Sequence, residues 1–229
     1  NSTGTHVDYG MGVRVLFGDQ TGYAYTEVTT LDQMLKAAKV ASKIALHSKE
    51  NRTEPVTLNG KLNGNLTLNS LYKIKIPWEE TEISQKIPYL KELNELIFSA
   101  DERVSKVMAR ISDSNSSVLY YNSEGVLASD IRPMFSLVAT CIMESNGRVE
   151  NGSSSRSFRA GFEFLNSDLI REIAGEVVKK TSFLFNAVRP NGGEMPVVMG
   201  SGSSGILLHE AIGHAFEADF NRLGTSIFA

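Results

Sequence analysis

The sequence predicts an α+β protein, in which several helices accompany a mainly antiparallel sheet and the chain ends in a strand, a glycine-rich turn and a metal-motif helix. Two alternating segments near the N-terminus flank a short polar turn, as in a β-hairpin. Residues 104–158 repeat apolar side chains with a period of two, interrupted by polar turns. Segments with helical spacing and capping residues lie on both sides of this region, which together favour the α+β class.

The first elements are a hairpin and a helix. Residues 12–17 and 22–28 alternate between apolar and other side chains, and the polar residues 18–21 join them. Thr30 is a typical N-cap residue, and the apolar positions after it follow one helical face to about His47. We expect His47 to be a solvated residue at the C-terminal end of this helix, where a cation is tolerated.

A polar loop and a helical region follow. Residues 49–72 contain two Asn-Gly steps and no helical period, which predicts an extended loop. Residues 84–108 have helical spacing, and the Ser-Ala-Asp sequence at 99–101 is expected to separate two helices there.

The period of two then predicts an antiparallel meander with polar turns. The turns are expected at residues 112–117 and 122–125. The expected strands are residues 107–111, 118–121, 126–130, 134–145 and 148–158. A helix from Asp168 to Lys180 comes next, capped by Asn166 and ending in a basic turn. Residues 195–199 are expected to form a short buried strand that leads into the glycine-rich turn.

The most informative motif is His209-Glu210-Ala-Ile-Gly213-His214, which lies in an otherwise apolar stretch. Burying two imidazoles and a carboxylate there is costly unless a partner compensates them. A divalent metal is an economical partner, because two neutral imidazoles bind it while the adjacent carboxylate remains free to move protons. His209 and His214 are therefore candidate metal ligands, and Glu210 is the candidate catalytic base.

The spacing of the two histidines requires a distortion of the helix. Five residues at about 100° each place them roughly 140° apart on an ideal helix. A π-bulge would bring them together, and Gly213 would ease it. The alternative is a pair of unrelated core histidines on a buried helix. Glu217 is compatible both with a carboxylate that orients His214 and with a solvated acidic helix end.

The glycine-rich turn at residues 200–205 also matches the Gly-x-Gly-x-x-Gly fingerprint of dinucleotide-binding folds. That fingerprint should open a βαβ unit whose second strand ends in an acidic residue. Here Asp219 is expected at the end of the same helix. We therefore interpret the glycines as positions that allow close approach of the backbone to a substrate or a metal ligand.

Composition limits the class of protein. The 229 residues have a formal net charge of −3, which argues against direct nucleic-acid binding because that needs a basic face. No apolar run reaches membrane-spanning length. The single cysteine excludes an intramolecular disulfide and fits a reducing compartment, so we expect a cytoplasmic protein. Cys141 itself is expected to be a small buried hydrophobic residue rather than a metal ligand.

Two parts of the chain resemble a known family. The C-terminal run MPVVMGSGSSGILLHEAIGHAFEADFNRLGTSIFA (residues 195–229) is similar to the signature region of the TldD/PmbA metalloproteases. The run GMGVRVLFGDQTGYAYTEVTTLDQMLKAAKVASKIA (residues 10–45) resembles the early strand, hairpin and helix of that family. Its members have been described both as modulators of DNA gyrase and as peptide-processing proteases. The His-Glu-x-x-x-His motif points to the metal-bearing TldD type.

The resemblance implies a domain organisation. Residues 1–190 would form an N-terminal α+β domain, with the polar loop near 49–72 inside it. Residues 191–229 would begin the metal-binding catalytic region. The resemblance also implies that the rest of that region is absent from this chain and holds the third ligand, a cysteine.

The resemblance further implies a zinc-dependent peptidase that hydrolyses unfolded or short peptides. Zn²⁺ bound by His209 and His214 would activate a water, and Glu210 would act as the general base. The expected partner is a PmbA-like subunit or a second copy in a homodimer. The alternative function is a non-catalytic, peptide- or protein-binding regulatory subunit of such a complex.

Overall fold

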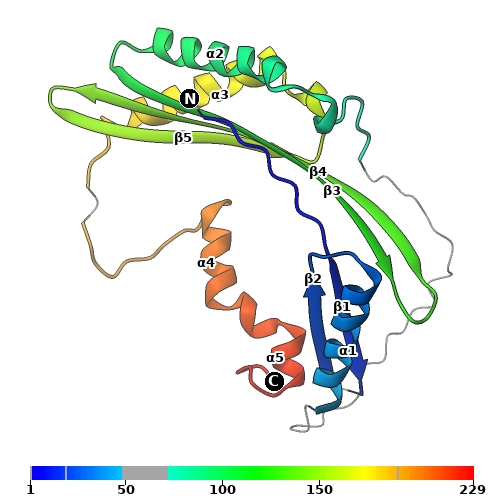
Figure 1. The fold of residues 1–229 in the computed structure, drawn as a ribbon. Helices are drawn as coiled ribbons and strands as arrows, with labels where there is room; N and C mark the ends of the chain where they lie inside the picture. Colours follow the sequence, from blue (N-terminus) through cyan, green and yellow to red (C-terminus); the bar gives the residue numbers. More distant parts are fainter. Residues whose placement is uncertain (1, 19, 48–71, 190) are drawn as a thin grey trace. The chain divides into compact units, whose positions relative to one another are not determined.

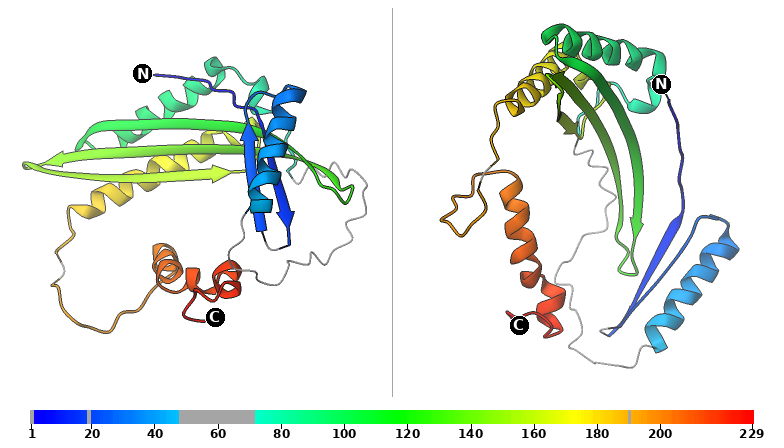
Figure 2. Two further views of the ribbon diagram at one scale, coloured as in Figure 1. Left: turned by 60° about the horizontal axis from the view of Figure 1, so that its bottom comes forward. Right: turned by 90° about the vertical axis from the view of Figure 1, so that its left-hand side faces the viewer.

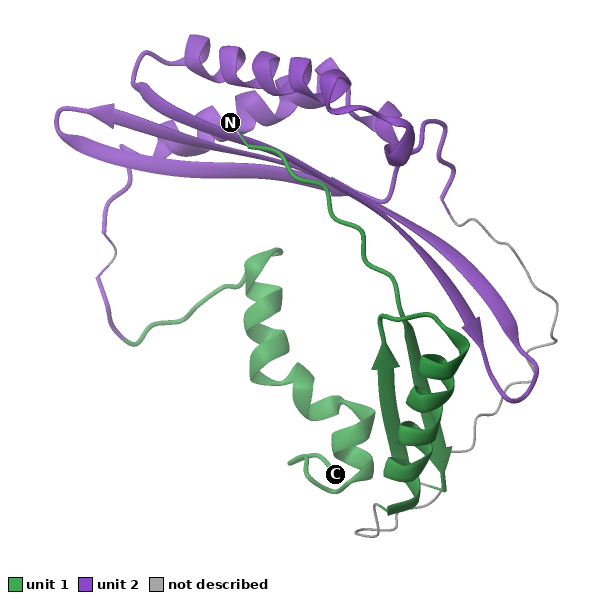
Figure 3. Ribbon diagram, viewed as in Figure 1, with its two compact units in different colours: residues 1–60, 194–229 green, residues 61–193 purple. Residues whose placement is uncertain are grey.

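The computed structural model describes residues 2–18, 20–47, 72–189 and 191–229, and its elements confirm the α+β class (Figure 1). The described chain separates into two compact units, residues 1–60 with 194–229 and residues 61–193 (Figure 3). The elements are β1 (Met11–Phe17), β2 (Gln20–Thr26), α1 (Leu31–His47), η1 (Trp78–Glu80), α2 (Ile83–Ala100), β3 (Val104–Tyr121), β4 (Leu127–Ser145), β5 (Arg148–Phe158), η2 (Phe162–Phe164), α3 (Ser167–Leu184), α4 (Ser203–Ala211), η3 (Gly213–Phe216) and α5 (Ala218–Arg222).

The predicted N-terminal hairpin and helix are confirmed. β1 and β2 pair in antiparallel register with Phe17 opposite Gln20, so the turn is tighter than predicted and Thr21 already belongs to the strand. α1 packs on the hairpin with a row of small side chains, all buried: Ala37, Ala41 and Ala45. Gly22 makes this close approach possible, because a Cβ at that position would overlap the Ala41 carbonyl.

The larger unit is a three-stranded antiparallel sheet in the order β3-β4-β5. Both α2 and α3 lie on the same face of the sheet (Figures 1 and 2). Alternate side chains of the central strand are buried beneath these helices: Phe135, Leu137, Ala139, Cys141 and Met143. Cys141 is the buried residue that the sequence predicted, and its burial raises the pKa of the thiol.

The strands of this sheet are longer than predicted. Residues 112–117 form no turn but continue β3, since they pair with β4 in unbroken register. The second helix expected after Asp101 does not form, because the chain enters β3 at Val104. Pairing with a long central strand therefore overrides the local preference of polar Ser and Asn side chains for turns.

Pro133 shows how β4 stays continuous through a residue that cannot donate a ladder hydrogen bond. At the hairpin end the Asn122 N–H donates to the carbonyl of Val126, the residue before β4 (3.1 Å). Counting from Val126, every second residue therefore forms hydrogen bonds with β3. Pro133 falls on the alternate positions, whose backbone N–H and carbonyl groups point away from β3 and toward the side of β5. β5 pairs with β4 only as far as Phe158 opposite Phe135, so it does not reach Pro133. The missing N–H of Pro133 thus costs no bond in the ladder.

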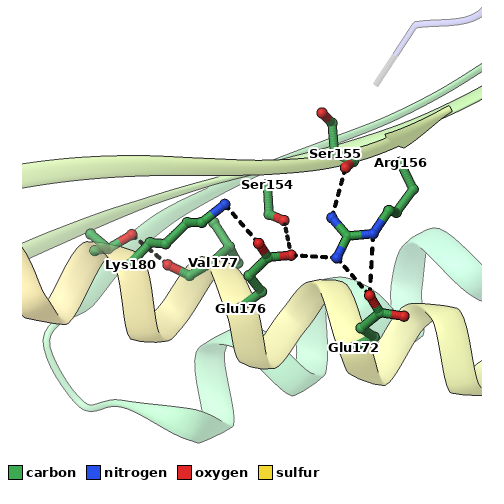
Figure 4. A network of polar contacts seen from close by, with 8 residues as sticks. Ser154, Ser155, Arg156, Glu172, Glu176, Val177 and Lys180 are labelled. Atoms are coloured by element: carbon green, nitrogen blue, oxygen red, sulfur yellow. Dashed lines mark hydrogen bonds and ion pairs between the residues drawn. The ribbon is translucent and has the colours of Figure 1, made fainter. Parts of the chain in front are cut away.

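A polar network ties β5 to α3 (Figure 4). Glu176 accepts a hydrogen bond from the Ser154 hydroxyl (2.7 Å) and pairs with Lys180 (2.7 Å) and Arg156 (2.9 Å). Arg156 also contacts Glu172 at 2.6 Å. The lysine, the serine and the arginine hold the pKa of Glu176 at about 2.

The helix predicted over residues 168–180 is confirmed, and it is longer than predicted, because α3 runs from Ser167 to Leu184. Asn166 caps it as expected, because its side-chain oxygen accepts from the backbone N–H groups of Asp168 and Leu169. The strand predicted at residues 195–199 is not formed, and these residues have no regular structure and exposed side chains. The loop predicted at 49–72 lies outside the described residues except for Tyr72. No described helix has the length and apolar character needed to cross a membrane.

Candidate metal centre

The glycine-rich turn leads into α4 as the sequence predicted (Figure 1). Gly202 is the residue before the helix and has a φ of 110°, a backbone conformation that favours glycine. The Ser204 hydroxyl donates to the Gly200 carbonyl across this turn. No strand lies on either side of the turn within residues 191–229, so the βαβ context of a dinucleotide fingerprint is not formed there.

A change of helix type brings the two histidines together. α4 ends at Ala211, Ile212 leaves helical geometry with φ −133° and ψ −38°, and the 3-10 helix η3 begins at Gly213. The ring centroids of His209 and His214 then lie 4.4 Å apart. The predicted π-bulge is therefore wrong. The helix breaks at Ile212 and restarts with a tighter winding, which removes the angular mismatch of a five-residue spacing.

Gly213 was expected to ease a π-bulge, but in the structure it leaves room for the ring of His209. The imidazole of His209 lies against its backbone, and a Cβ built on Gly213 would be 3.1 Å from His209 Nδ1. A side chain at this position would push on the ring, so the absence of one lets His209 sit close to the break.

His209, Glu210 and His214 converge on one point. Each offers one potential ligand atom, and these atoms all lie within 4.8 Å of one another. Glu210 Oε2 is 3.6 Å from His214 Nε2. The three residues named as candidates from the sequence are thus brought together, although none of them is buried in the described chain. The alternative of two unrelated core histidines does not fit, because the rings are in contact and exposed.

Glu217 contacts the second ring nitrogen of His214. Its Oε1 lies 2.6 Å from His214 Nδ1. An ionised carboxylate only accepts hydrogen bonds, so Nδ1 carries the proton in this contact and Nε2 is left toward Glu210. The hydrogen bond with Glu217, helped by the charges of Glu217 and Glu210, raises the pKa of His214.

Two side chains to which the sequence gave no role fix the segment around Glu217. Asn221 Nδ2 donates to the carbonyls of Ala215 (3.1 Å) and Glu217 (2.9 Å). The Ser226 hydroxyl also donates to the Ala215 carbonyl, at 2.5 Å. The signal available in the sequence was only the Asn, Thr and Ser residues within 221–226, which are also typical of an ordinary turn.

Large apolar side chains surround the centre without being covered. α4 carries three consecutive large apolar residues, Ile206 to Leu208, which point to different sides of the helix, as in a helix that is covered on more than one face. Its large apolar side chains, and those that follow the break, are exposed in the described chain: Ile206, Leu207, Leu208, Ile212 and Phe216.

Comparisons with known proteins agree on one family. Residues 1–45 match the model of the PmbA/TldA metallopeptidase domain 1, and residues 76–182 match the model of the PmbA/TldA metallopeptidase central domain. The metalloprotease TldD homolog of Buchnera aphidicola (Acyrthosiphon pisum) is 36% identical over 97% of the chain and 46% of the relative. The homolog of Haemophilus influenzae is 35% identical over the same shares. The chain spans about half the length of these relatives.

Solved structures share the fold. TldE of Thermococcus kodakarensis superimposes with a TM-score of 0.64 at 19% identity, over 94% of this chain and 47% of that one. A Thermotoga maritima protein described as a candidate modulator of a DNA gyrase superimposes with a TM-score of 0.61 at 20% identity, over 81% and 40%. With two family models, homologous sequences over nearly its whole length and the same fold, the chain belongs to the PmbA/TldD family.

Proposed function

We propose that the longer protein of which this chain forms a part is a zinc-dependent peptidase that hydrolyses unfolded or short peptides. The observation that carries the proposal is the convergence of His209, Glu210 and His214 at a helix break. The names of the relatives, metalloprotease TldD homologs, support a metal-dependent peptidase class.

The donor set fits a zinc ion. Zinc is bound by imidazole nitrogen, and catalytic sites keep three protein ligands and one open position. His214 offers Nε2 because Glu217 occupies Nδ1. His209 and His214 would hold the ion, and we infer a third ligand in the half of the longer protein that follows this chain. When bound, zinc would polarise the scissile carbonyl and make a water molecule more acidic.

Glu210 would move the protons. Its carboxylate lies 3.6 Å from the His214 nitrogen that would face the ion, and it is exposed rather than engaged in a short hydrogen bond. From this position it would accept a proton from the attacking water and then deliver a proton to the leaving amine.

The partner and the cellular compartment are inferred from the shared fold and from the cysteine content. A fold shared with TldE supports a complex with a PmbA-like subunit, with a homodimer as the other arrangement. The single buried cysteine supports a reducing compartment, which we take to be the cytoplasm.

The test uses the full-length protein with Glu210→Gln, which keeps the shape of the side chain and removes the base. We expect near-normal zinc content and peptide hydrolysis slowed by about 100-fold or more. Asp219→Asn is the matched control, because it removes one charge from the same segment without touching His214. Hydrolysis by Glu210→Gln at the wild-type rate would contradict the role of Glu210. Wild-type protein that binds peptides without cleaving them, regardless of chelator, would favour the non-catalytic regulatory subunit.

A further inference from the structure

Glu217 makes the shortest contact at the candidate metal centre, yet it is not one of the three converging groups. Its Oε1 is 2.6 Å from His214 Nδ1, whereas Glu210 is 3.6 Å from the opposite nitrogen of the same ring. The two carboxylates thus address the two nitrogens of one imidazole from opposite sides.

We propose that Glu217 is the positioning residue of the centre: it holds His214 in the tautomer whose Nε2 is free to bind the metal, and it fixes the plane of that ring. This inference rests on the proposed metal site and adds to it a residue that never contacts the metal or the substrate. The chemistry is that of a carboxylate–histidine–metal arrangement, in which a carboxylate receives the N–H of a ligating imidazole and raises its basicity.

The backbone around Glu217 is built to keep the carboxylate in place. Glu217 is the residue that precedes α5, and its N–H donates to the His214 carbonyl (3.2 Å). Its own carbonyl accepts from the Asn221 side chain (2.9 Å) and from the Asn221 N–H (3.1 Å). Asn221 and Ser226 together hold the Ala215 carbonyl, which lies between the histidine and the glutamate. The separation between His214 and Glu217 is therefore fixed by contacts at Ala215, which lies between them in the sequence, and at Glu217 itself.

A neighbouring carboxylate shows the contrast with an ordinary acidic helix end. Asp219 lies two residues further on in α5, where its carboxylate accepts a hydrogen bond from the Phe220 N–H (3.0 Å). Both residues add a negative charge to the segment, but only Glu217 is directed at the imidazole. Comparing the two separates a directed hydrogen bond from a general effect of charge.

The experiment measures zinc affinity of the full-length protein by competition with a chromophoric chelator. We expect Glu217→Ala to weaken zinc binding by about 10- to 100-fold. Glu217→Gln retains a neutral acceptor for the Nδ1 proton, so we expect a loss of less than about 10-fold. Asp219→Asn is expected to bind zinc as the wild type does. Equal losses in Glu217→Ala and Asp219→Asn, or wild-type affinity in Glu217→Ala, would overturn the proposal.

A second readout is independent of metal and of turnover. Nitrogen chemical shifts of ¹⁵N-labelled histidine side chains report which ring nitrogen carries the proton in the metal-free protein. We expect the neutral ring of His214 to have its proton on Nδ1 in the wild type and in Glu217→Gln, and to populate both tautomers in Glu217→Ala. The same tautomer mixture in the wild type and in Glu217→Ala would refute the positioning role.

These measurements distinguish the positioning role from the peptidase function. Glu217-dependent zinc affinity without any peptide hydrolysis supports the positioning role and rejects the peptidase. Zinc-dependent hydrolysis with a zinc affinity that Glu217→Ala leaves unchanged does the reverse.

Discussion

The three-stranded sheet with its two helices and the segment that holds the metal motif differ in how well their own residues bury apolar side chains. In residues 61–193 the core contains side chains with no exposure, such as Phe135 and Ile173. In residues 194–229 no described residue is buried, and Val198 and Ile227 are 98% and 87% exposed. Both segments contain many large apolar residues (Val, Ile, Leu, Met and Phe), so composition does not explain the difference in burial.

The difference in burial raises the question of which residues cover the apolar side chains of the motif segment, residues 194–229. The sheet region closes its core through strands and helices that all lie within this chain. The motif segment is too short to enclose its own apolar side chains, since its longest helix, α4, has 9 residues. Because this chain spans about half the length of its relatives, we infer that another part of the longer protein encloses the segment and completes the metal centre.

The largest expected effect concerns the metal. Two imidazoles alone leave a tetrahedral zinc shell half filled, so the 229-residue chain should bind zinc on the order of 1000-fold more weakly than the full-length protein. Chelator competition on both proteins measures this. A well-occupied zinc site formed entirely by residues of this chain would contradict the inference that the downstream half supplies a ligand.

The second prediction compares the truncation of a buried and of an exposed apolar side chain. Ile173→Ala creates a cavity in a closed core and should cost about 2–5 kcal/mol of unfolding free energy in the 229-residue chain. Leu207→Ala should cost less than about 0.5 kcal/mol there, because Leu207 is 62% exposed. In the full-length protein the Leu207→Ala cost should rise to about 2 kcal/mol or more. Urea denaturation checks both. An equally small cost for Leu207→Ala in the two proteins would show that the segment stays uncovered.

A third prediction tests the helix break. Gly213→Ala places a Cβ in tight contact with the His209 ring, 3.1 Å from Nδ1, and should displace the ring and weaken zinc binding of the full-length protein on the order of tenfold. Gly205→Ala is the control, since a Cβ there meets nothing within 4 Å. Both variants are compared by the same chelator titration. Equal zinc affinities for them would mean that the ring tolerates a side chain at the break.

The smallest effect is expected in the polar network of the sheet region. The folded-state pKa of Glu176 is about 2, below its ordinary value of 4.5. Its contribution to stability is therefore present above pH 4.5 and is lost as the pH falls from there toward 2. Glu176→Gln should lower the melting temperature at pH 7 and flatten its decline in this window. Asp168→Asn, which changes an exposed ion pair on the same helix, should leave the decline unchanged.

Local sequence was sufficient where the structure depends on neighbours along the chain. The hairpin β1–β2, the helix α1 and the cap of α3 by Asn166 were predicted because alternation, helical spacing and capping act over a few residues. The residue types of His209, Glu210 and His214 likewise marked three side chains that the structure brings together, while the metal itself stays a prediction.

Only the tertiary structure decided the features that depend on distant partners. The polar residues 112–117 became strand because β4 offers them a continuous ladder, and Pro133 is tolerated because β5 ends before it. The contact between the rings of His209 and His214 depends on a helix break at Ile212, whose geometry the spacing of the motif could not specify. Sequence patterns record local preference and residue chemistry, whereas strand length, helix breaks and burial are set by which other parts of the protein are available to pack against.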